Sequence, residues 1–305
     1  MYYSLDRTIK RLITHFEIPR NLKGSIGFDL PANLDDPKFR LNESQFFALI
    51  DHIVISRMDG MIEVLKQESW MFSCPPITAA FASSQRLNQA LNRLDLFKSF
   101  SSPFRLQISH QMGTVVNLRS NSGIDIPHTV QIMELLMISL LAQTFTQRPF
   151  SGHLTLDERL QNDPIALALS AQIQAHPRFG DQSTLFISAE MANLHIHPQM
   201  SARFVVKRVN ESGKLSERVI DLLMRHLPAG NGSQQFVAEK LFMSKRSLQR
   251  KLALEGVSFS ELLASARKYM ADIYLTDPSI REHELSFLLG YGDPRSYRRA
   301  SREWN

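Results

Sequence analysis

Two short helices joined by a tight turn are predicted at residues 233–252, and this pair constrains the fold more than any other feature. The second helix carries basic and amide side chains on the face that would point outward. A compact helix pair with such a polar face has the shape that fits a DNA major groove. Apolar residues that recur at helical spacing would face inward, namely Phe236, Val237, Leu241, Leu248 and Leu252.

The outward face of the second helix carries the candidate base-reading residues. Arg246, Gln249 and Arg250 share one face because they are three and four residues apart. Arginine pairs bidentately with guanine and glutamine with adenine, whereas Lys245 and Lys251 are expected to contact phosphate. A helix face exposed only to solvent is the alternative interpretation. The predicted DNA-binding set of this helix is Lys245, Arg246, Ser247, Gln249, Arg250 and Lys251.

The same pattern recurs near the end of the chain. A helix is predicted over 282–289, a glycine turn over 290–294 and a basic helix over 295–304. Arg299 could instead form an ion pair within the protein. The predicted DNA-binding residues of this second pair are Arg295, Ser296, Arg298 and Arg299.

A long amphipathic helix is predicted between the two pairs. It begins at the capping box formed by Ser258 and Glu261. About 19 linking residues at about 1.5 Å each span roughly 28 Å. That length approaches the roughly 34 Å between successive major-groove faces of B-DNA, so one chain could contact two adjacent groove segments.

The rest of the sequence predicts a second domain of mixed α and β structure. The small polar residues at 209–214 mark a linker, which separates an α+β domain at 1–208 from an all-α domain at 214–305. In the first domain, helices are expected at 42–58, 79–100 and 129–145, a strand hairpin at 106–109 and 115–118, and strand structure at 183–196.

Composition and charge exclude several classes of protein. A hydrophobic content of 43% and a charged content of 21% are those of a globular protein. No uncharged apolar run reaches the 18 residues of a membrane span, and no signal pattern is expected at the N-terminus. The single cysteine, Cys74, excludes an intrachain disulfide and fits a reducing cytosol; we expect it to be inert.

The net charge of +5 is concentrated in the predicted all-α domain. Residues 214–305 hold 15 Lys and Arg against 11 Asp and Glu, a net charge of +4, whereas residues 1–213 have a net charge of +1. On a helix that faces DNA, this excess supplies the attraction to phosphate.

The sequence supports neither a catalytic site nor a metal site. His195 and His197 alternate along a predicted strand, but no cysteine or carboxylate with suitable spacing joins them as zinc ligands. No glycine-rich phosphate loop, nucleophile elbow or pair of catalytic carboxylates is evident. We therefore expect no cofactor, no metal and no enzymatic activity.

The C-terminal motifs resemble the DNA-binding domain of AraC/XylS-type transcription regulators, with its two helix-turn-helix units. The N-terminal part is similar to the sensor domain of the ornithine-utilisation-type branch of that family, which is described as arabinose-binding-like. The resemblance rests on residues 237–252, 255–263, 288–291, 293–294, 299–300 and 304, and on 34–37, 87–91 and 178–180.

Three features depart from the family pattern. Glu282 stands where a branched apolar residue is usual, and Ser301 replaces an aromatic residue. Such a truncation at a buried site costs about 3–5 kcal/mol. The chain also stops at Asn305, before the short tail that the resemblance leads one to expect. These departures predict that the second pair is less stable, or that it mainly binds phosphate.

The resemblance implies a bacterial, cytoplasmic transcription regulator that binds promoter or operator DNA and works with RNA polymerase. Its N-terminal domain would sense a small molecule or mediate homodimerisation. The alternative is a ligand-binding or protein-interaction regulator, in which a degenerate second pair leaves DNA binding weak or non-specific.

Overall fold

The computed structural model describes the chain apart from residues 1, 4, 6, 35, 37, 68–74, 174–176, 201–213, 277–279 and 305. The described residues form two compact units. The N-terminal unit comprises Met1–Pro75 and Arg86–His195, and the C-terminal unit comprises Pro76–Gln85 and Ile196–Asn305. Cys74 and the expected linker at 209–214, except Lys214, lie outside the described residues. The position of the linker therefore stays a prediction.

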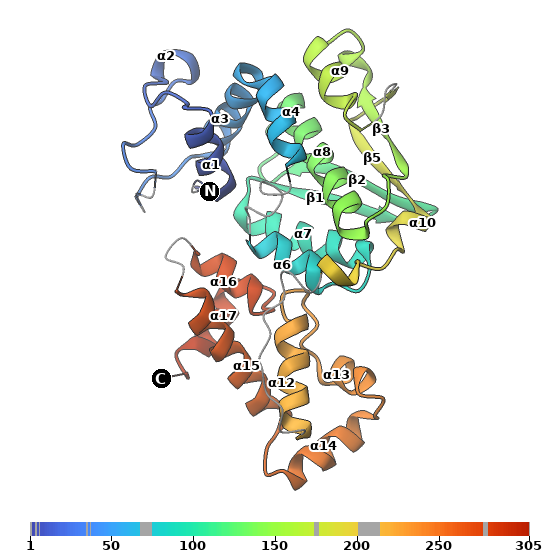
Figure 1. Ribbon diagram of the computed structural model, residues 1–305. Coiled ribbons are helices and arrows are strands. Elements are labelled where there is room, and N and C mark those ends of the chain that lie inside the picture. Colours follow the sequence, from blue (N-terminus) through green and yellow to red (C-terminus); the bar gives the residue numbers. More distant parts are fainter. Residues whose placement is uncertain are drawn as a thin grey trace. The chain divides into compact units, whose positions relative to one another are not determined.

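The N-terminal unit contains helices and one five-stranded sheet, as the mixed composition of this part predicted (Figure 1). Its helices are α1 (Arg7–His15), α2 (Lys23–Ile26), α3 (Glu43–Ser56), α4 (Met58–Lys66), α7 (Leu87–Ser101), α8 (His128–Thr146), α9 (Pro164–Ser170), α10 (Ala189–Ala192) and the 3-10 helix η1 (Glu158–Leu160). Its strands are β1 (Phe104–His110), β2 (Gly113–Ser120), β3 (Gly152–Asp157), β4 (Arg178–Gly180) and β5 (Thr184–Ser188).

The strands lie in the order β1-β2-β5-β3-β4. All neighbouring pairs are antiparallel except β3 and β4, which run parallel. Helix α7 packs against β1, and α8 packs against β2. The apolar side chains of β3 and β5 alternate with exposed or half-buried ones, because successive side chains of a strand point to opposite faces of the sheet.

The predicted hairpin is confirmed as β1 and β2. Its register pairs Leu106 with Leu118 and His110 with Thr114. Gly113 begins β2 with a φ of +154°, and a Cβ there would lie 2.7 Å from the main-chain oxygen of Ile187 on β5. Glycine is therefore required at the point where β2 meets β5.

Helices α3 and α8 occupy the positions that their sequence patterns predicted. Asn42 caps α3 by accepting a hydrogen bond of 2.9 Å from the amide of Gln45, whose side chain accepts one from the amide of Asn42. Helix α8 is long and apolar enough to cross a membrane by length and composition, but 67% of its apolar window is buried in the protein. It packs against α3, α7, α9 and β2.

The single helix expected at 79–100 is wrong: the structure has two helices. Helix α6 (Pro75–Ser83) ends before residues 84–86, and α7 begins at Leu87. Arg86 has extended backbone angles and forms an isolated β-bridge with His195. This long-range pairing overrides the helical pattern, and the two helices belong to different units.

The strand structure expected at 183–196 is only partly confirmed. Strand β5 ends at Ser188, whose side chain caps the short helix α10 by accepting a hydrogen bond of 3.2 Å from the amide of Met191. A local side-chain hydrogen bond of this kind competes with continuation of the strand. His195 and His197 therefore do not share a strand.

The C-terminal unit consists of helices in the part that the structure describes (Figure 1). Besides α6, these are α12 (Leu215–His226), α13 (Gln234–Lys240), α14 (Lys245–Leu254), α15 (Phe259–Tyr274), α16 (Glu282–Leu288) and α17 (Pro294–Ser301). Their apolar faces enclose one core, in which Val219, Leu223 and Ala266 are fully buried where α12 packs on α15.

Candidate nucleic-acid interface

Helices α13 and α14 form the first helix pair, and side-chain caps define both of its helices. Ser233 caps α13 by accepting a hydrogen bond of 3.1 Å from the amide of Phe236, and Ser244 caps α14 in the same way from the amide of Ser247. The turn between them passes through Phe242, which has a left-handed φ of +55°. These local interactions explain why the sequence breaks the helix here.

The apolar residues of the first pair point inward, as predicted. Val237 and Leu248 are fully buried, Leu241 and Leu252 are nearly so, and Phe236 is half-buried against the same core. Burial of this stripe fixes the rotation of α14 and therefore the set of side chains that it exposes.

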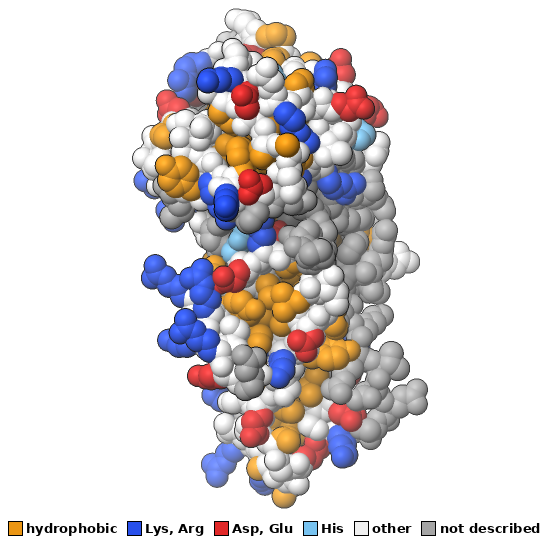
Figure 2. All heavy atoms as spheres, turned by 90° about the vertical axis from the view of Figure 1, so that its left-hand side faces the viewer, with side chains coloured by type: hydrophobic (Ala, Val, Ile, Leu, Met, Phe, Trp, Pro, Cys, Tyr) orange, Lys and Arg blue, Asp and Glu red, His pale blue; other side chains and the backbone are white. Residues whose placement is uncertain are grey.

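Helix α14 presents a basic surface to solvent. Lys245, Arg246, Arg250 and Lys251 are exposed, and none forms a salt bridge with a described residue. Ser247 is half-buried. Unpaired exposed cations are free to contact phosphate or base edges. In Figure 2, Lys and Arg side chains gather on one margin at the height that α16 and α17 have in Figure 1, and isolated ones lie at the lower end, at the height of α14.

Gln249 lies on the same exposed face but has a partner within the protein. Its side-chain amide donates a hydrogen bond of 3.3 Å to the side-chain oxygen of Gln234 at the start of α13. This bond holds Gln249 at the junction of the two helices. Sequence reasoning missed the contact because no local spacing relates residues 15 positions apart.

Helices α16 and α17 form the second helix pair. Asp293 caps α17 by accepting a hydrogen bond of 3.0 Å from the amide of Ser296, and its other oxygen accepts one of 2.7 Å from the Ser296 hydroxyl. These hydrogen bonds hold the pKa of Asp293 below its usual range. The Ser296 hydroxyl is therefore engaged in the cap. Gly290, with a φ of +75°, begins the turn, where a Cβ would lie 2.8 Å from the main-chain oxygen of Leu227.

The three predicted arginines of α17 differ in their partners. Arg295 and Arg299 are exposed and form no salt bridge with a described residue. Arg298 forms a salt bridge with Glu282 at the start of α16. Glu282 therefore joins the two helices of the second pair.

Ser301 lies at the end of α17 and is half-buried. Its hydroxyl donates a hydrogen bond of 3.2 Å to the main-chain oxygen of Arg298. Nearby, Tyr297 and Trp304 pack edge to face with ring centroids 5.8 Å apart, and both lie against the core. Aromatic packing in this region is thus provided by side chains other than residue 301.

Helix α15 connects the two pairs and holds the second one through Arg267. The guanidinium of Arg267 donates a hydrogen bond of 3.0 Å to the main-chain oxygen of Leu289 and lies 4.0 Å from the centre of the Tyr291 ring. Burial lowers the pKa of Arg267. The predicted capping box of Ser258 and Glu261 starts this helix.

Helix α12 makes two further contacts, one with the residue that follows α14 and one with α6, and local sequence patterns do not reveal them. The carboxylate of Glu255, just after α14, accepts hydrogen bonds of 2.9 and 3.0 Å from the amides of Leu215 and Ser216 at the start of α12. His226 on α12 donates through Nδ1 a hydrogen bond of 3.2 Å to the main-chain oxygen of Ser83 on α6. Burial lowers the pKa of His226.

The histidines considered as zinc ligands do not come together with other ligands. His195 is exposed and His197 is half-buried. Among the described residues, no group of three or more His, Cys, Asp or Glu side chains is placed to hold a metal ion.

Comparison with known proteins identifies relatives over part of the chain. It is 39% identical over 90 residues to the HTH-type transcriptional regulator VirS of Mycobacterium tuberculosis, which is 30% of this chain and 26% of that protein. It is 35% identical over 94 residues to the HTH-type transcriptional regulator VqsM of Pseudomonas aeruginosa, covering 31% and 29%. The ornithine utilization regulator of Pseudomonas aeruginosa is 39% identical over 67 residues, covering 22% and 20%.

The matched segments thus span about a quarter of the length of these curated relatives. Among solved structures, the transcriptional regulator CdpR from Pseudomonas aeruginosa aligns with 98% of this chain and 94% of its own, with a TM-score of 0.39 and 18% identity. No family model matches the chain. The chain therefore shares a segment with proteins named as helix-turn-helix transcriptional regulators.

Proposed function

We propose that this protein is a sequence-specific DNA-binding transcription regulator of the AraC/XylS type. The observation that carries the proposal is the repeated arrangement of the C-terminal unit. Each helix pair ends in an exposed basic helix, and α15 connects the pairs while its buried face packs in their common core. The named relatives and the family motifs support the same function.

In this proposal α14 is the main recognition helix. Arg246 and Arg250 contact guanine edges in the major groove, and Lys245 and Lys251 contact phosphate. Gln249 pairs with adenine after releasing Gln234, or stays bound to Gln234 and contacts the backbone. The exposure of the four cations and their lack of salt bridges with described residues support these roles.

The second helix pair contributes mainly phosphate contacts. Arg295 and Arg299 are exposed for this role, whereas the Asp293 carboxylate already caps the amide end of α17. Arg298 is held by Glu282, so it positions α17 more than it reads bases. The 16 residues of α15 give a helix about 24 Å long, which leaves the turns to cover the rest of the roughly 34 Å between groove segments.

The N-terminal unit is proposed to modulate DNA binding by taking up a small molecule or by homodimerisation. A ligand can shift the regulator only by its difference in affinity between the DNA-binding and non-binding states. The further elements of the proposal are a bacterial cytoplasmic location and contact with RNA polymerase at promoters.

The test is selection of binding sites from a random DNA library with the full chain, followed by titration of the selected site. Arg250→Ala is expected to lower affinity by about 1–3 kcal/mol and to relax the preference at one base position. Arg218→Ala, which removes an exposed arginine of α12 outside both pairs, is the matched control. Recovery of no preferred sequence, or equal effects of the two substitutions, would contradict the proposal.

The Arg298–Glu282 salt bridge favours one alternative function. It removes an arginine from the proposed DNA surface, as expected for a regulator whose second pair no longer supports specific binding. Such a protein would bind genomic fragments and competitor DNA with equal affinity. The same titration with an unrelated competitor distinguishes the two functions.

A further inference from the structure

The sheet of the N-terminal unit opens at one end, and the opening forms a polar cavity. Strand β2 pairs with β5 only from Gly113 to Val116, whereas it pairs with β1 up to Ser120. Beyond Val116, the side-chain amide of Asn117 bridges to Gln182 with a hydrogen bond of 3.0 Å. The cavity has a volume of about 820 Å³. This volume lies within the range typical of small-molecule sites, about 300–1,000 Å³.

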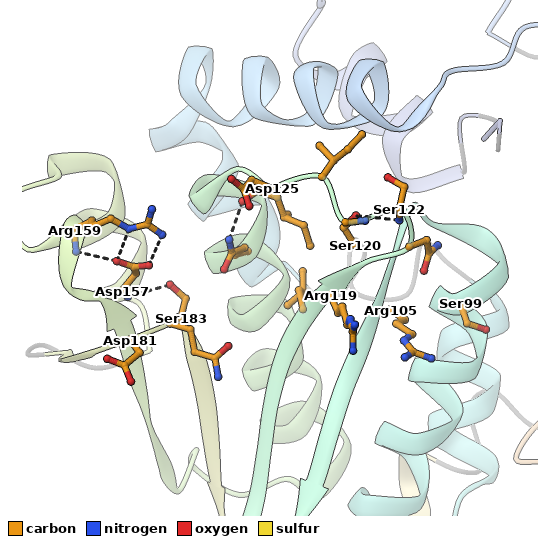
Figure 3. Close-up of a pocket in the computed structure, with 17 residues that line it drawn as sticks. Ser99, Arg105, Arg119, Ser120, Ser122, Asp125, Asp157, Arg159, Asp181 and Ser183 are labelled. Carbon is orange, nitrogen blue, oxygen red and sulfur yellow. Dashed lines mark hydrogen bonds and ion pairs between the residues drawn. The ribbon is translucent and has the colours of Figure 1, made fainter.

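One wall of the cavity carries two arginines that lie directly opposite each other. Arg105 on β1 and Arg119 on β2 are cross-strand partners, and both are exposed (Figure 3). Like charges at such positions destabilise a strand pair unless an anion lies near them. The negative charge of Asp95 partly compensates the positive charge of Arg105. The Asp95 carboxylate is also bound within the protein, because it accepts a hydrogen bond of 2.9 Å from the amide of Leu106. No described residue forms a salt bridge with either arginine.

The opposite wall carries an excess of negative charge. Asp157 at the end of β3 forms a salt bridge of 2.6 Å with Arg159, which holds the pKa of Asp157 at about 2. That pair is electrically neutral. Asp125 and Asp181 also line the cavity and are exposed, and Figure 3 shows Asp157, Arg159 and Asp181 across the opening from the two arginines. The cavity is therefore positive on one side and negative on the other.

We propose that this cavity binds a small zwitterion, with its carboxylate on Arg105 and Arg119 and its ammonium group toward Asp125 and Asp181. Two guanidinium groups side by side supply charge-assisted donors to a carboxylate. A dianion of the same size would meet repulsion from the two aspartates, and a dication would meet repulsion from the arginines. The side chains of Ser99, Asn121 and Gln182 add hydroxyl and amide groups to the cavity lining.

This inference names a site and a ligand class for the small-molecule modulation proposed above. It depends on the proposed function only for the consequence that ligand binding has for DNA affinity. Ligand binding itself is a property of the N-terminal unit and is measurable without DNA.

The test is calorimetric titration of the full chain with 4-aminobutanoate, 5-aminopentanoate and 6-aminohexanoate, which vary the separation of the two charges. Glutarate and cadaverine match the five-carbon member as a dianion and a dication. We expect at least one of the three amino acids to bind at least about tenfold more tightly than both glutarate and cadaverine. A tenfold difference in affinity corresponds to the contribution of about one hydrogen bond to a charged group. The proposal is overturned if no amino acid binds, or if glutarate or cadaverine binds as tightly.

Substitutions place the binding at this cavity. Arg119→Gln and Asp181→Asn are each expected to lower the affinity for the zwitterion by about tenfold or more. Arg119→Lys is expected to lower it by less. Arg40→Gln removes an exposed arginine of the same unit that does not line the cavity, and is expected to bind as the unsubstituted chain does. If Arg119→Gln does not fold, as judged by circular dichroism, Asp181→Asn and Arg119→Lys carry the test. Unchanged affinity in the folded variants overturns the assignment.

Operator affinity with and without the zwitterion separates this inference from the proposed function. If the zwitterion binds in the calorimeter but leaves the affinity for operator DNA unchanged, the site is supported and the proposed modulation by a small molecule is contradicted. Specific operator binding by a chain that takes up none of the three amino acids supports the proposed DNA-binding function and overturns the site.

Discussion

Arg298 on α17 forms a salt bridge with Glu282 on α16, so one arginine of the proposed DNA surface has its partner inside the second helix pair. Both side chains remain largely exposed, at 60% and 45%. An exposed pair of this kind contributes at most about 1 kcal/mol to stability. The main consequence of this salt bridge is therefore that it reduces the positive charge that α17 presents to DNA.

Glu282→Gln is expected to release Arg298 for phosphate contact. DNA affinity should rise, and the dependence of log affinity on log salt should steepen by about 0.9, the value for one added phosphate contact. The measurement is fluorescence anisotropy with labelled DNA over a range of sodium chloride concentrations. Glu303→Gln removes an equal charge after α17 without breaking this salt bridge. Equal salt slopes for the two variants would show that Arg298 gains no contact.

Arg267→Met is expected to destabilise the C-terminal unit by about 1.5–3 kcal/mol. The substitution leaves the main-chain oxygen of Leu289 without its charged donor and removes the cation from the Tyr291 ring. Chemical denaturation followed by circular dichroism measures the change. Arg225→Met, at an exposed arginine of α12, should alter stability by less than about 0.5 kcal/mol. A comparable loss in both variants would contradict the bracing role of Arg267.

Phe242→Gly is expected to stabilise the protein by about 0.5–1 kcal/mol. Phe242 has a φ of +55° and is 99% exposed, so its backbone is strained while its side chain buries almost no apolar surface. Glycine removes the strain, although part of the gain is offset by its greater freedom in the unfolded chain. Phe242→Ala removes the ring but keeps the strain, and should leave the denaturation midpoint nearly unchanged. If the glycine variant has a denaturation midpoint no higher than that of the alanine variant, backbone strain at Phe242 is refuted.

The stability of the C-terminal unit is expected to fall as the pH drops below the ordinary histidine pKa of 6.5. Burial lowers the pKa of His226 in the folded protein, so the unfolded chain binds the proton more readily. The contribution of neutral His226 is therefore complete above pH 6.5 and is lost as the pH falls through the folded-state pKa. His226→Asn should flatten this part of the profile in thermal melts at stepped pH values. His195→Asn, at an exposed histidine, is the control, and an unaltered slope in the His226 variant would exclude this cause.

Much of the secondary structure was predictable because its signals are local. The capping boxes at Asn42 and Ser258, the hairpin of β1 and β2, and the buried stripe of the first helix pair depend on residues close in sequence. The predictions that failed involve distant partners. The helix at 79–100 breaks where Arg86 pairs with His195, more than 100 residues away. No periodicity within one segment contains that information.

The candidate sites divide in the same way. Sequence alone determined which residues are basic, which segments form the helix pairs, and which family motifs they carry, although α17 ends at Ser301 and not at Trp304 as predicted. Only the tertiary structure decided that Arg298 pairs with Glu282, that Gln249 bonds to Gln234, and that Arg105 and Arg119 face a cavity across from aspartates. The physical reason is that propensity and capping act over a few residues, whereas an ion pair or a cavity wall depends on where folding brings distant side chains.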